Sequence, residues 1–269
     1  KLEFRRKDMN IVSFGGGTNS TAMIIGMYRR KIPIDLILFS DTGGEHPHTY
    51  KHVSRFNEWL KIHGLPQITV VRNVDKEGNV FTLEEECLKS HSLPSIAYGW
   101  KKCSLKHKIG PQDKYCNHHP ECKEIWKTGK KINKYIGYDA GEVRRKEHAF
   151  AIDLQDKKYK KIYALIDWDW YREDCIKAIQ EEGLELPGKS SCFFCPSMKK
   201  TEIKALRRDY PELFNRAITI EDNAQNQLIK VKGLGRSFAW KNYMEWEDSQ
   251  ISMCQFYEEN EIPCSCYDG

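Results

Sequence analysis

The chain has 269 residues, enough for one α/β domain of ordinary size with a smaller appendage, and its 40% hydrophobic and 30% charged content excludes a disordered chain. No apolar run approaches the ~18 residues needed to span a bilayer, and the first residues lack the apolar stretch of a secretory signal, so we expect a cytoplasmic protein without a membrane segment. The net charge of +5 favours phosphorylated ligands and is compatible with nucleic acid.

Strand and helix patterns alternate along most of the chain. Apolar runs of strand length occur at residues 9–14, 34–39, 67–71, 132–138 and 161–166. Helical spacing of apolar residues occurs at residues 19–30, 48–63, 81–90 and 171–182. This alternation predicts an α/β fold with a Rossmann-like, doubly wound parallel sheet.

The pattern changes beyond Pro187, where short helices are predicted at 199–208, 211–223 and 240–259. We therefore expect residues 1–187 to form the α/β domain. Residues 188–269 are expected to form a small, helical, cysteine-containing C-terminal region.

A glycine-rich loop stands where the first predicted strand passes into the first predicted helix. Glycines let the backbone approach a ligand closely, and the N-terminus of a helix favours an anion such as phosphate. The candidate binding residues are Ser13, Gly15, Gly16, Gly17, Thr18, Asn19 and Ser20. A tight turn with an ordinary helix cap is the alternative, since the loop lacks both the Walker lysine and the Gly-x-Gly-x-x-Gly fingerprint.

Residues 16–20 resemble the PP-loop, Ser-Gly-Gly-x-Asp-Ser, of ATP pyrophosphatases and sulfonucleotide reductases, with Asn19 in place of the Asp. The segment 40–50, which contains Asp41, Thr42 and Gly43, resembles the Asp-Thr-Gly segment of phosphoadenosine phosphosulfate (PAPS) reductases. In a doubly wound sheet, ligands bind at the carboxyl ends of the strands, where both segments are expected to lie.

Two later segments extend the resemblance to about residues 9–200. Residues 103–111 resemble Cys-Cys-x-x-x-Lys-Val-x-Pro of the reductases, with Lys108 at the lysine, and residues 137–145 resemble Gly-x-Arg-x-x-Glu-Ser. The chain is most similar to PAPS reductase-like proteins of phages and mobile elements. The resemblance implies an adenine nucleotide alpha hydrolase type of fold, further nucleotide contacts from Asp139 and Glu142, Lys108 and Arg144 as catalytic cations, and compatibility with Mg²⁺.

Ten cysteines include the pair Cys192 and Cys195, whose spacing allows both thiolates to face one metal ion. The pair resembles half of the set that holds a [4Fe–4S] cluster in adenylyl-sulfate reductases, and Cys103 matches another member. The expected fourth ligand is Cys266, with Cys264 as the alternative. Soft thiolate ligands suit an Fe–S cluster or zinc, and a site without metal stays open.

Cys116 and Cys122 form a second close pair. We interpret them as a chance or local thiol pair rather than a separate zinc loop, because no second pair lies at finger spacing.

The resemblance implies an enzyme that acts at the α-phosphate or sulfate side of ATP or a sulfonated adenosine nucleotide, in sulfur transfer or reduction. A nucleic acid or a protein is the acceptor we consider, while the sequence does not define the oligomeric state. The reductases carry Glu-Cys-Gly-Leu/Ile-His near the C-terminus, whereas this chain has Pro-Cys-Ser-Cys-Tyr-Asp-Gly. The alternative is a catalytically reduced nucleotide- or nucleic-acid-binding regulator with a structural zinc site.

Overall fold

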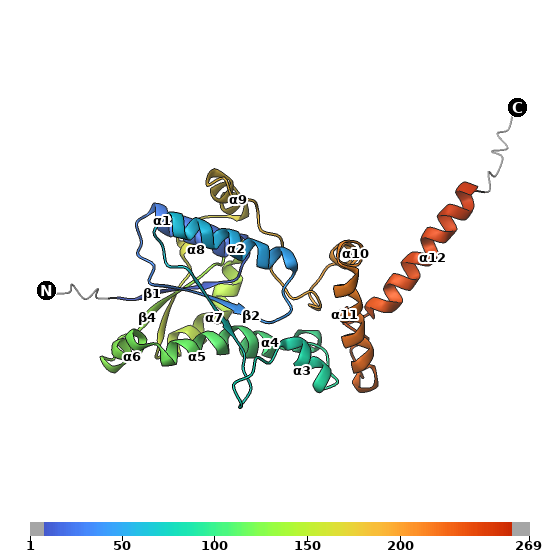
Figure 1. Ribbon diagram of the computed structural model, residues 1–269, viewed down its shortest axis with the longest axis horizontal. Helices are drawn as coiled ribbons and strands as arrows, with labels where there is room; N and C mark the ends of the chain where they lie inside the picture. Colours follow the sequence, from blue (N-terminus) through green and yellow to red (C-terminus); the bar gives the residue numbers. More distant parts are fainter. Residues whose placement is uncertain (1–7, 260–269) are drawn as a thin grey trace, which may run out of the picture. The chain divides into compact units, whose positions relative to one another are not determined.

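A parallel sheet forms the centre of the computed structural model, which describes residues 8–259, with side chains through residue 250 (Figure 1). Its strands follow the order β3-β2-β1-β4-β5, and every neighbouring pair is parallel. The strands are β1 Asn10–Phe14, β2 Leu36–Asp41, β3 Ile68–Arg72, β4 Ile132–Ile136 and β5 Tyr159–Ile162. This order on both sides of β1 confirms the predicted Rossmann-like, doubly wound fold.

Helices cover both faces of the sheet, as Figure 1 shows. One layer contains α1 Thr18–Arg29, α2 Pro47–Ile62, α8 Ala164–Asp167 and α9 Arg172–Glu181. The other contains α5 Gly110–His118 and α6 Pro120–Lys127, which contact β2, β3 and β4. Because side chains alternate along a strand, Val12 and Phe14 of β1 enter the first core layer, while Ile11 enters the second.

The predicted strand 161–166 is wrong in its second half. The strand β5 ends at Ile162, and Ala164 and Leu165 are buried in the one-turn helix α8. Lys161 on β5 is fixed by ion pairs with Asp153 and Asp156, both at 3.2 Å. Apolar residues therefore continue across the end of the strand because the following turn is itself buried against α1.

Several helices carry too weak an apolar pattern to be predicted. The helix α7 Val143–Gln155 has no buried residue, and its apolar side chains Phe150, Ile152 and Leu154 are exposed instead of forming a packed face. Between residues 102 and 109, α4 Lys102–Ser104 leads into a π-helical turn, η2 Leu105–Ile109, and then into α5. The remaining short turn of this part is η3 Ala140–Glu142.

The chain forms two compact units, the first made of Lys1–Leu83 with Cys103–Cys192 and the second of Glu84–Lys102 with Phe193–Gly269. The second unit contains α3 Leu83–Lys89, η1 Ser95–Tyr98, α10 Lys200–Asp209, α11 Pro211–Ala224, η4 Gln225–Gln227 and α12 Trp240–Glu259. The segment 84–102 belongs to it because Asn223 on α11 donates to the carbonyl of Leu88 at 2.8 Å and Arg216 pairs with Glu84. No helix within residues 8–259 is both long and apolar enough to cross a membrane.

Glu221 organises the second unit from inside. Its side chain is fully buried and accepts hydrogen bonds from the backbone N–H groups of Leu234 at 2.7 Å, Trp240 at 2.9 Å and Lys241 at 3.1 Å. Burial raises the pKa of Glu221, although these three donors act in the opposite direction. One carboxylate thus joins α11 to the chain that enters α12.

Glu221→Ala is expected to lower the free energy of unfolding by about 3 kcal/mol, because buried N–H groups lose their acceptor. Equilibrium urea unfolding followed by circular dichroism measures the change. Asp222→Ala is the control, since its exposed pair with Lys241 contributes about 0–1 kcal/mol. Equal stability of the two variants would contradict the role of Glu221.

Candidate functional site

The glycine loop between β1 and α1 provides no side-chain cap for the start of the helix. Gly16 has a φ of +71°, and a Cβ there would lie 3.0 Å from the Thr49 methyl group, so a side chain does not fit. Ser20 and Thr21 direct their hydroxyl protons to the carbonyl of Gly17, at 3.1 and 2.9 Å. Among the described residues no side chain caps α1, and its first turn has no acidic residue. This end of the helix therefore favours an anion.

A neutral histidine contacts the beginning of α1, next to the loop. The Nε2 atom of His52 lies 2.9 Å from Thr21 Oγ1. Because the Thr21 proton already goes to Gly17, His52 must donate through Nε2–H. Burial, and then the nearby His48, lowers the pKa of His52 to about 4, so the ring stays neutral at physiological pH.

The loop lies at the switch point of the sheet, where β1 has β2 on one side and β4 on the other. The amide Nδ2 of Asn19 donates to Asp139 Oδ2 at 2.9 Å and to Glu142 Oε2 at 3.0 Å. Arg172 donates to Asn19 Oδ1 at 2.9 Å, and Arg145 pairs with Glu142. The structure thus brings together three residues that the sequence placed at the site from segments 120 or more positions apart.

Position 137 sets how closely these segments approach. A Cβ at Gly137 would lie 2.9 Å from both the Cα and N atoms of Ser20, closer than real Cβ atoms come to backbone. Only glycine therefore allows the end of β4 to pass the first turn of α1 at this distance.

The second predicted loop follows β2 and is held by Asp41. Its Oδ1 accepts from the Gly43 N–H at 2.9 Å and from Tyr50 OH at 2.7 Å, and its Oδ2 accepts from Arg72 Nε at 2.9 Å. Burial, followed by the hydrogen bond to Asp41, raises the pKa of Tyr50. Asp41 therefore orders the loop through its own hydrogen bonds.

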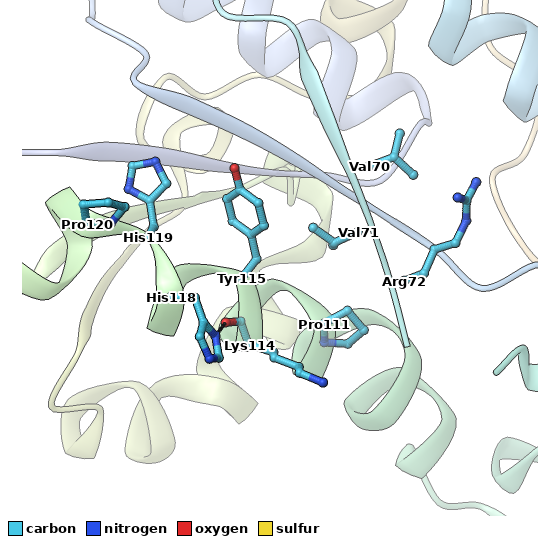
Figure 2. Close-up of a pocket in the computed structure, with 9 residues that line it drawn as sticks. All are labelled: Val70, Val71, Arg72, Pro111, Lys114, Tyr115, His118, His119 and Pro120. Carbon is cyan, nitrogen blue, oxygen red and sulfur yellow. Dashed lines mark hydrogen bonds between the residues drawn. The ribbon is translucent and has the colours of Figure 1, made fainter. Parts of the chain in front are cut away.

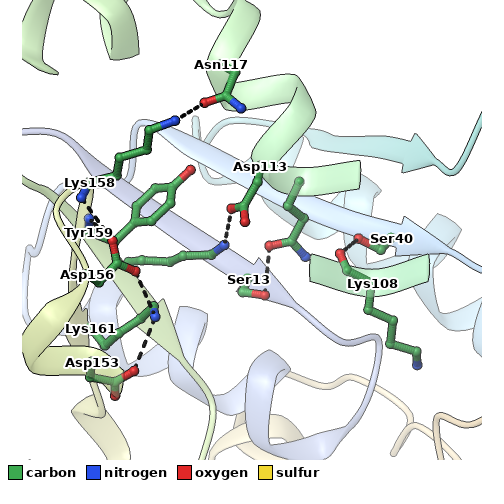
Figure 3. Close-up of polar contacts among 12 residues, drawn as sticks. Ser13, Ser40, Lys108, Asp113, Asn117, Asp153, Asp156, Lys158, Tyr159 and Lys161 are labelled. Carbon is green, nitrogen blue, oxygen red and sulfur yellow. Dashed lines mark hydrogen bonds and ion pairs between the residues drawn. The ribbon is translucent and has the colours of Figure 1, made fainter. Parts of the chain in front are cut away.

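Glu45 is a residue of this loop that the sequence reasoning missed. Its side chain is buried, accepts from Thr42 Oγ1 at 3.2 Å and pairs with Lys108 Nζ at 3.1 Å. Thr42 Oγ1 also lies 3.2 Å from Cys192 Sγ. Ser40 donates to the carbonyl of Lys108 at 2.6 Å, which holds the π-helical turn against β2 (Figure 3). An acidic residue just after the Asp-Thr-Gly-Gly segment was the available signal.

Two predicted residues lie elsewhere. The Ser13 hydroxyl donates to Gln112 Oε1 at 3.0 Å on the α5 side of the sheet. Arg144 is exposed and makes no hydrogen bond or ion pair with the part of the chain that the structure describes. Arg145 pairs with Glu142 instead, and Arg172 donates to the amide oxygen of Asn19.

Three of the four expected metal ligands lie among the residues that the structure describes. Cys192 is buried beside Thr42, Cys103 is half-buried on α4, and Cys195 belongs to the second unit. Within residues 8–259, no three Cys, His, Asp or Glu side chains are grouped so as to hold a metal ion. Cys266 lies outside the described residues, so the metal site stays a prediction.

The other cysteine pair lies in the second core layer. Cys116 and Cys122 are both fully buried, and Cys122 Sγ lies 3.8 Å from Met9 Sδ. The hydrogen bond from Cys122 lowers the pKa of Cys116 to about 7.

No family profile matches the chain. Uncharacterized proteins from an archaeon and a phage are similar in sequence. Two are from Methanocaldococcus jannaschii. One is 24% identical over 248 residues, which is 88% of this chain and 45% of the relative. The other is 25% identical over 217 residues, which is 77% of this chain and 46% of the relative. The chain thus spans about half the length of these archaeal relatives.

The phage relative is a nin region protein of Escherichia phage lambda, 26% identical over 239 residues, 78% of this chain and 74% of the relative. One similar solved structure is the U34-tRNA thiolase NcsA from Methanococcus maripaludis with its [4Fe–4S] cluster. The alignment covers 81% of this chain and 73% of the thiolase chain, at 13% identity and a TM-score of 0.41. A phage protein is among the sequence relatives, as expected, while none of these names is that of a PAPS reductase.

Asn19→Asp is expected to lower the free energy of unfolding by about 1–2 kcal/mol, because a third carboxylate would replace an amide donor beside Asp139 and Glu142. Chemical denaturation at neutral pH measures this change. Adding Asp139→Asn should restore most of the loss, in a double-mutant cycle that includes Asp139→Asn alone. A stable Asn19→Asp protein, or strict additivity, would show that the amide does not bridge the carboxylates.

Proposed function

We propose that the chain is a PP-loop enzyme that binds ATP or a sulfonated adenosine nucleotide at the switch point of the sheet. The observation that carries this proposal is the uncapped N-terminus of α1, reached through Gly16 and Gly17 beside the end of β4. Phosphate groups are the anions that such a helix start binds.

The surrounding charges suit a reaction at the α-phosphate or sulfate. Backbone N–H groups at the start of α1 would stabilise negative charge that develops on phosphate oxygens. Lys108 supplies a cation at the same carboxyl edge, where Glu45 holds its Nζ. Mg²⁺ bound to phosphates uses one or two carboxylates, and Asp139 and Glu142 are the pair available at Asn19.

The reaction we propose is one of the two that the resemblance to PP-loop and PAPS reductase-like enzymes implies: ATP adenylates an acceptor with loss of pyrophosphate, or sulfite is released from a sulfonucleotide. Sulfur transfer to a nucleic-acid or protein acceptor is the reaction type. The support is the order of four matching segments along the chain, together with the contacts that join these segments in two pairs, Asn19 with Asp139 and Glu45 with Lys108.

Gly16→Val is expected to abolish binding of both ATP and adenylyl sulfate, because the added side chain would collide with Thr49 and Phe39 and displace the loop. Isothermal titration calorimetry measures the affinity. Gly64→Val is the matched control, since Gly64 also has a positive φ but has open space around it. Unchanged affinity of Gly16→Val for both nucleotides, in a protein with a native circular dichroism spectrum, would refute the loop assignment.

A regulator without turnover is the second candidate, favoured by Asn19, whose amide is already bound to Asp139 and Glu142. Pyrophosphate release from ATP, measured with and without nucleic acid, separates the two. Release above the background of Gly16→Val identifies an enzyme. Tight ATP binding without release of pyrophosphate from ATP or of sulfite from adenylyl sulfate identifies the regulator.

For the cysteines, we propose one metal site formed by Cys103, Cys192, Cys195 and Cys266, holding a [4Fe–4S] cluster or zinc. Anaerobically purified protein is expected to contain iron or zinc. The Cys192→Ser variant is expected to lose this metal, because the substitution removes one of the proposed thiolate ligands. Iron and zinc analysis with the absorption spectrum measures the content.

Cys116→Ser serves as the control for metal content, since Cys116 is buried in the second core layer with Cys122. It should keep the full metal content. A wild-type protein without either metal, or a Cys192→Ser protein with a full complement, would contradict the proposed site.

A further inference from the structure

A separate pocket lies at the open edge of the sheet, between the edge strand β3 and the helix α5. It has a volume of about 480 Å³ and is lined by Val70, Val71 and Arg72 on the strand side. Figure 2 shows that the helix side is formed by side chains from α5, among them Lys114 and Tyr115. A volume of this size accommodates a small organic ligand.

The charge of the lining is positive. Arg72 and Lys114 contribute guanidinium and ammonium groups, His118 adds an imidazole, and no acidic side chain of the described chain lines the pocket. Lys114 is exposed and makes no ion pair with any residue that the structure describes. The nearby carboxylate Asp113 is 3.3 Å from Lys134. Lys114 therefore offers an anionic ligand an ammonium group that no described carboxylate holds, whereas the Arg72 guanidinium also pairs with Asp41 at 2.9 Å.

The rest of the lining is apolar and aromatic. Val70 is 45% exposed although it lies on a strand, and Tyr115 is only partly buried. Aromatic rings next to cations bind ligands that combine a flat ring with a phosphate, because the ring stacks while the cation binds the phosphate. A nucleotide unit has both parts.

We infer that this pocket binds a nucleoside monophosphate unit, either free or within single-stranded nucleic acid. Tyr115 provides the surface for the base, and Lys114 and Arg72 bind the phosphate. The site is distinct from the glycine loop, which lies at the β1 and β4 ends. Arg72 joins the two regions, since it lines the pocket and donates to Asp41 at 2.9 Å.

Fluorescence anisotropy with labelled twelve-nucleotide oligouridylate and oligothymidylate tests the inference, and neither probe contains adenine. Lys114→Glu is expected to weaken binding at least tenfold at low salt and to reduce the slope of log K against log salt by about one. Tyr115→Leu keeps the apolar volume and should weaken binding about fivefold or more through lost stacking.

Lys123→Glu is the matched control, because it makes the same charge change on the exposed surface of α6 outside the pocket. Its affinity should stay within twofold of wild type. If uridine monophosphate competes at a concentration similar to that of the oligonucleotide, the ligand is a free nucleotide. If only the oligonucleotide binds, the ligand is nucleic acid.

Absence of binding to all three probes, or equal weakening by Lys114→Glu and Lys123→Glu, would overturn the inference. ATP binding is measured on the same variants and should not change. Gly16→Val should in turn leave oligonucleotide binding intact, so failure of the pocket and failure of the nucleotide loop are distinguishable.

Discussion

The bridge from the Asn19 amide to Asp139 and Glu142 is the interaction on which the site depends. It joins the first turn of the helix after β1 to the turn after β4. These two turns are adjacent in space but far apart in the chain. Arg172 and Arg145 complete the charge balance around it. Because an amide both donates to the carboxylates and accepts from Arg172, it satisfies three partners without adding a charge at the switch point.

The sequence predicted the parts of the site that depend on local signals. Glycines, a strand before them and a helix after them are visible within about ten residues, and so the loop and the doubly wound parallel sheet could be anticipated. The Asp41 loop was found in the same way. The hydrogen bonds that Asp41 accepts could not be, because the bond from Arg72 depends on how β2 and β3 are paired, and the bond from Tyr50 depends on how α2 packs beside the loop.

The residues that were missed depend on tertiary contacts. Glu45 gains its importance from Lys108, which a π-helical turn delivers from more than sixty positions away. Arg145 rather than Arg144 faces Glu142, because one step along a helix turns a side chain by about 100°. The helix α7 has no buried residue, and its apolar side chains Phe150, Ile152 and Leu154 are exposed, so no packed apolar face marks it in the sequence.

Gly137 has a consequence for how this protein can vary. The end of β4 and the first turn of α1 meet backbone to backbone, with no side chain between them. The distance between the two segments at this point is therefore fixed by main-chain dimensions and not by the volume of any core residue. The apolar layers can repack after substitutions without moving these two segments apart, so the spacing between the helix start and the Asp139 turn can remain constant while the core sequence changes.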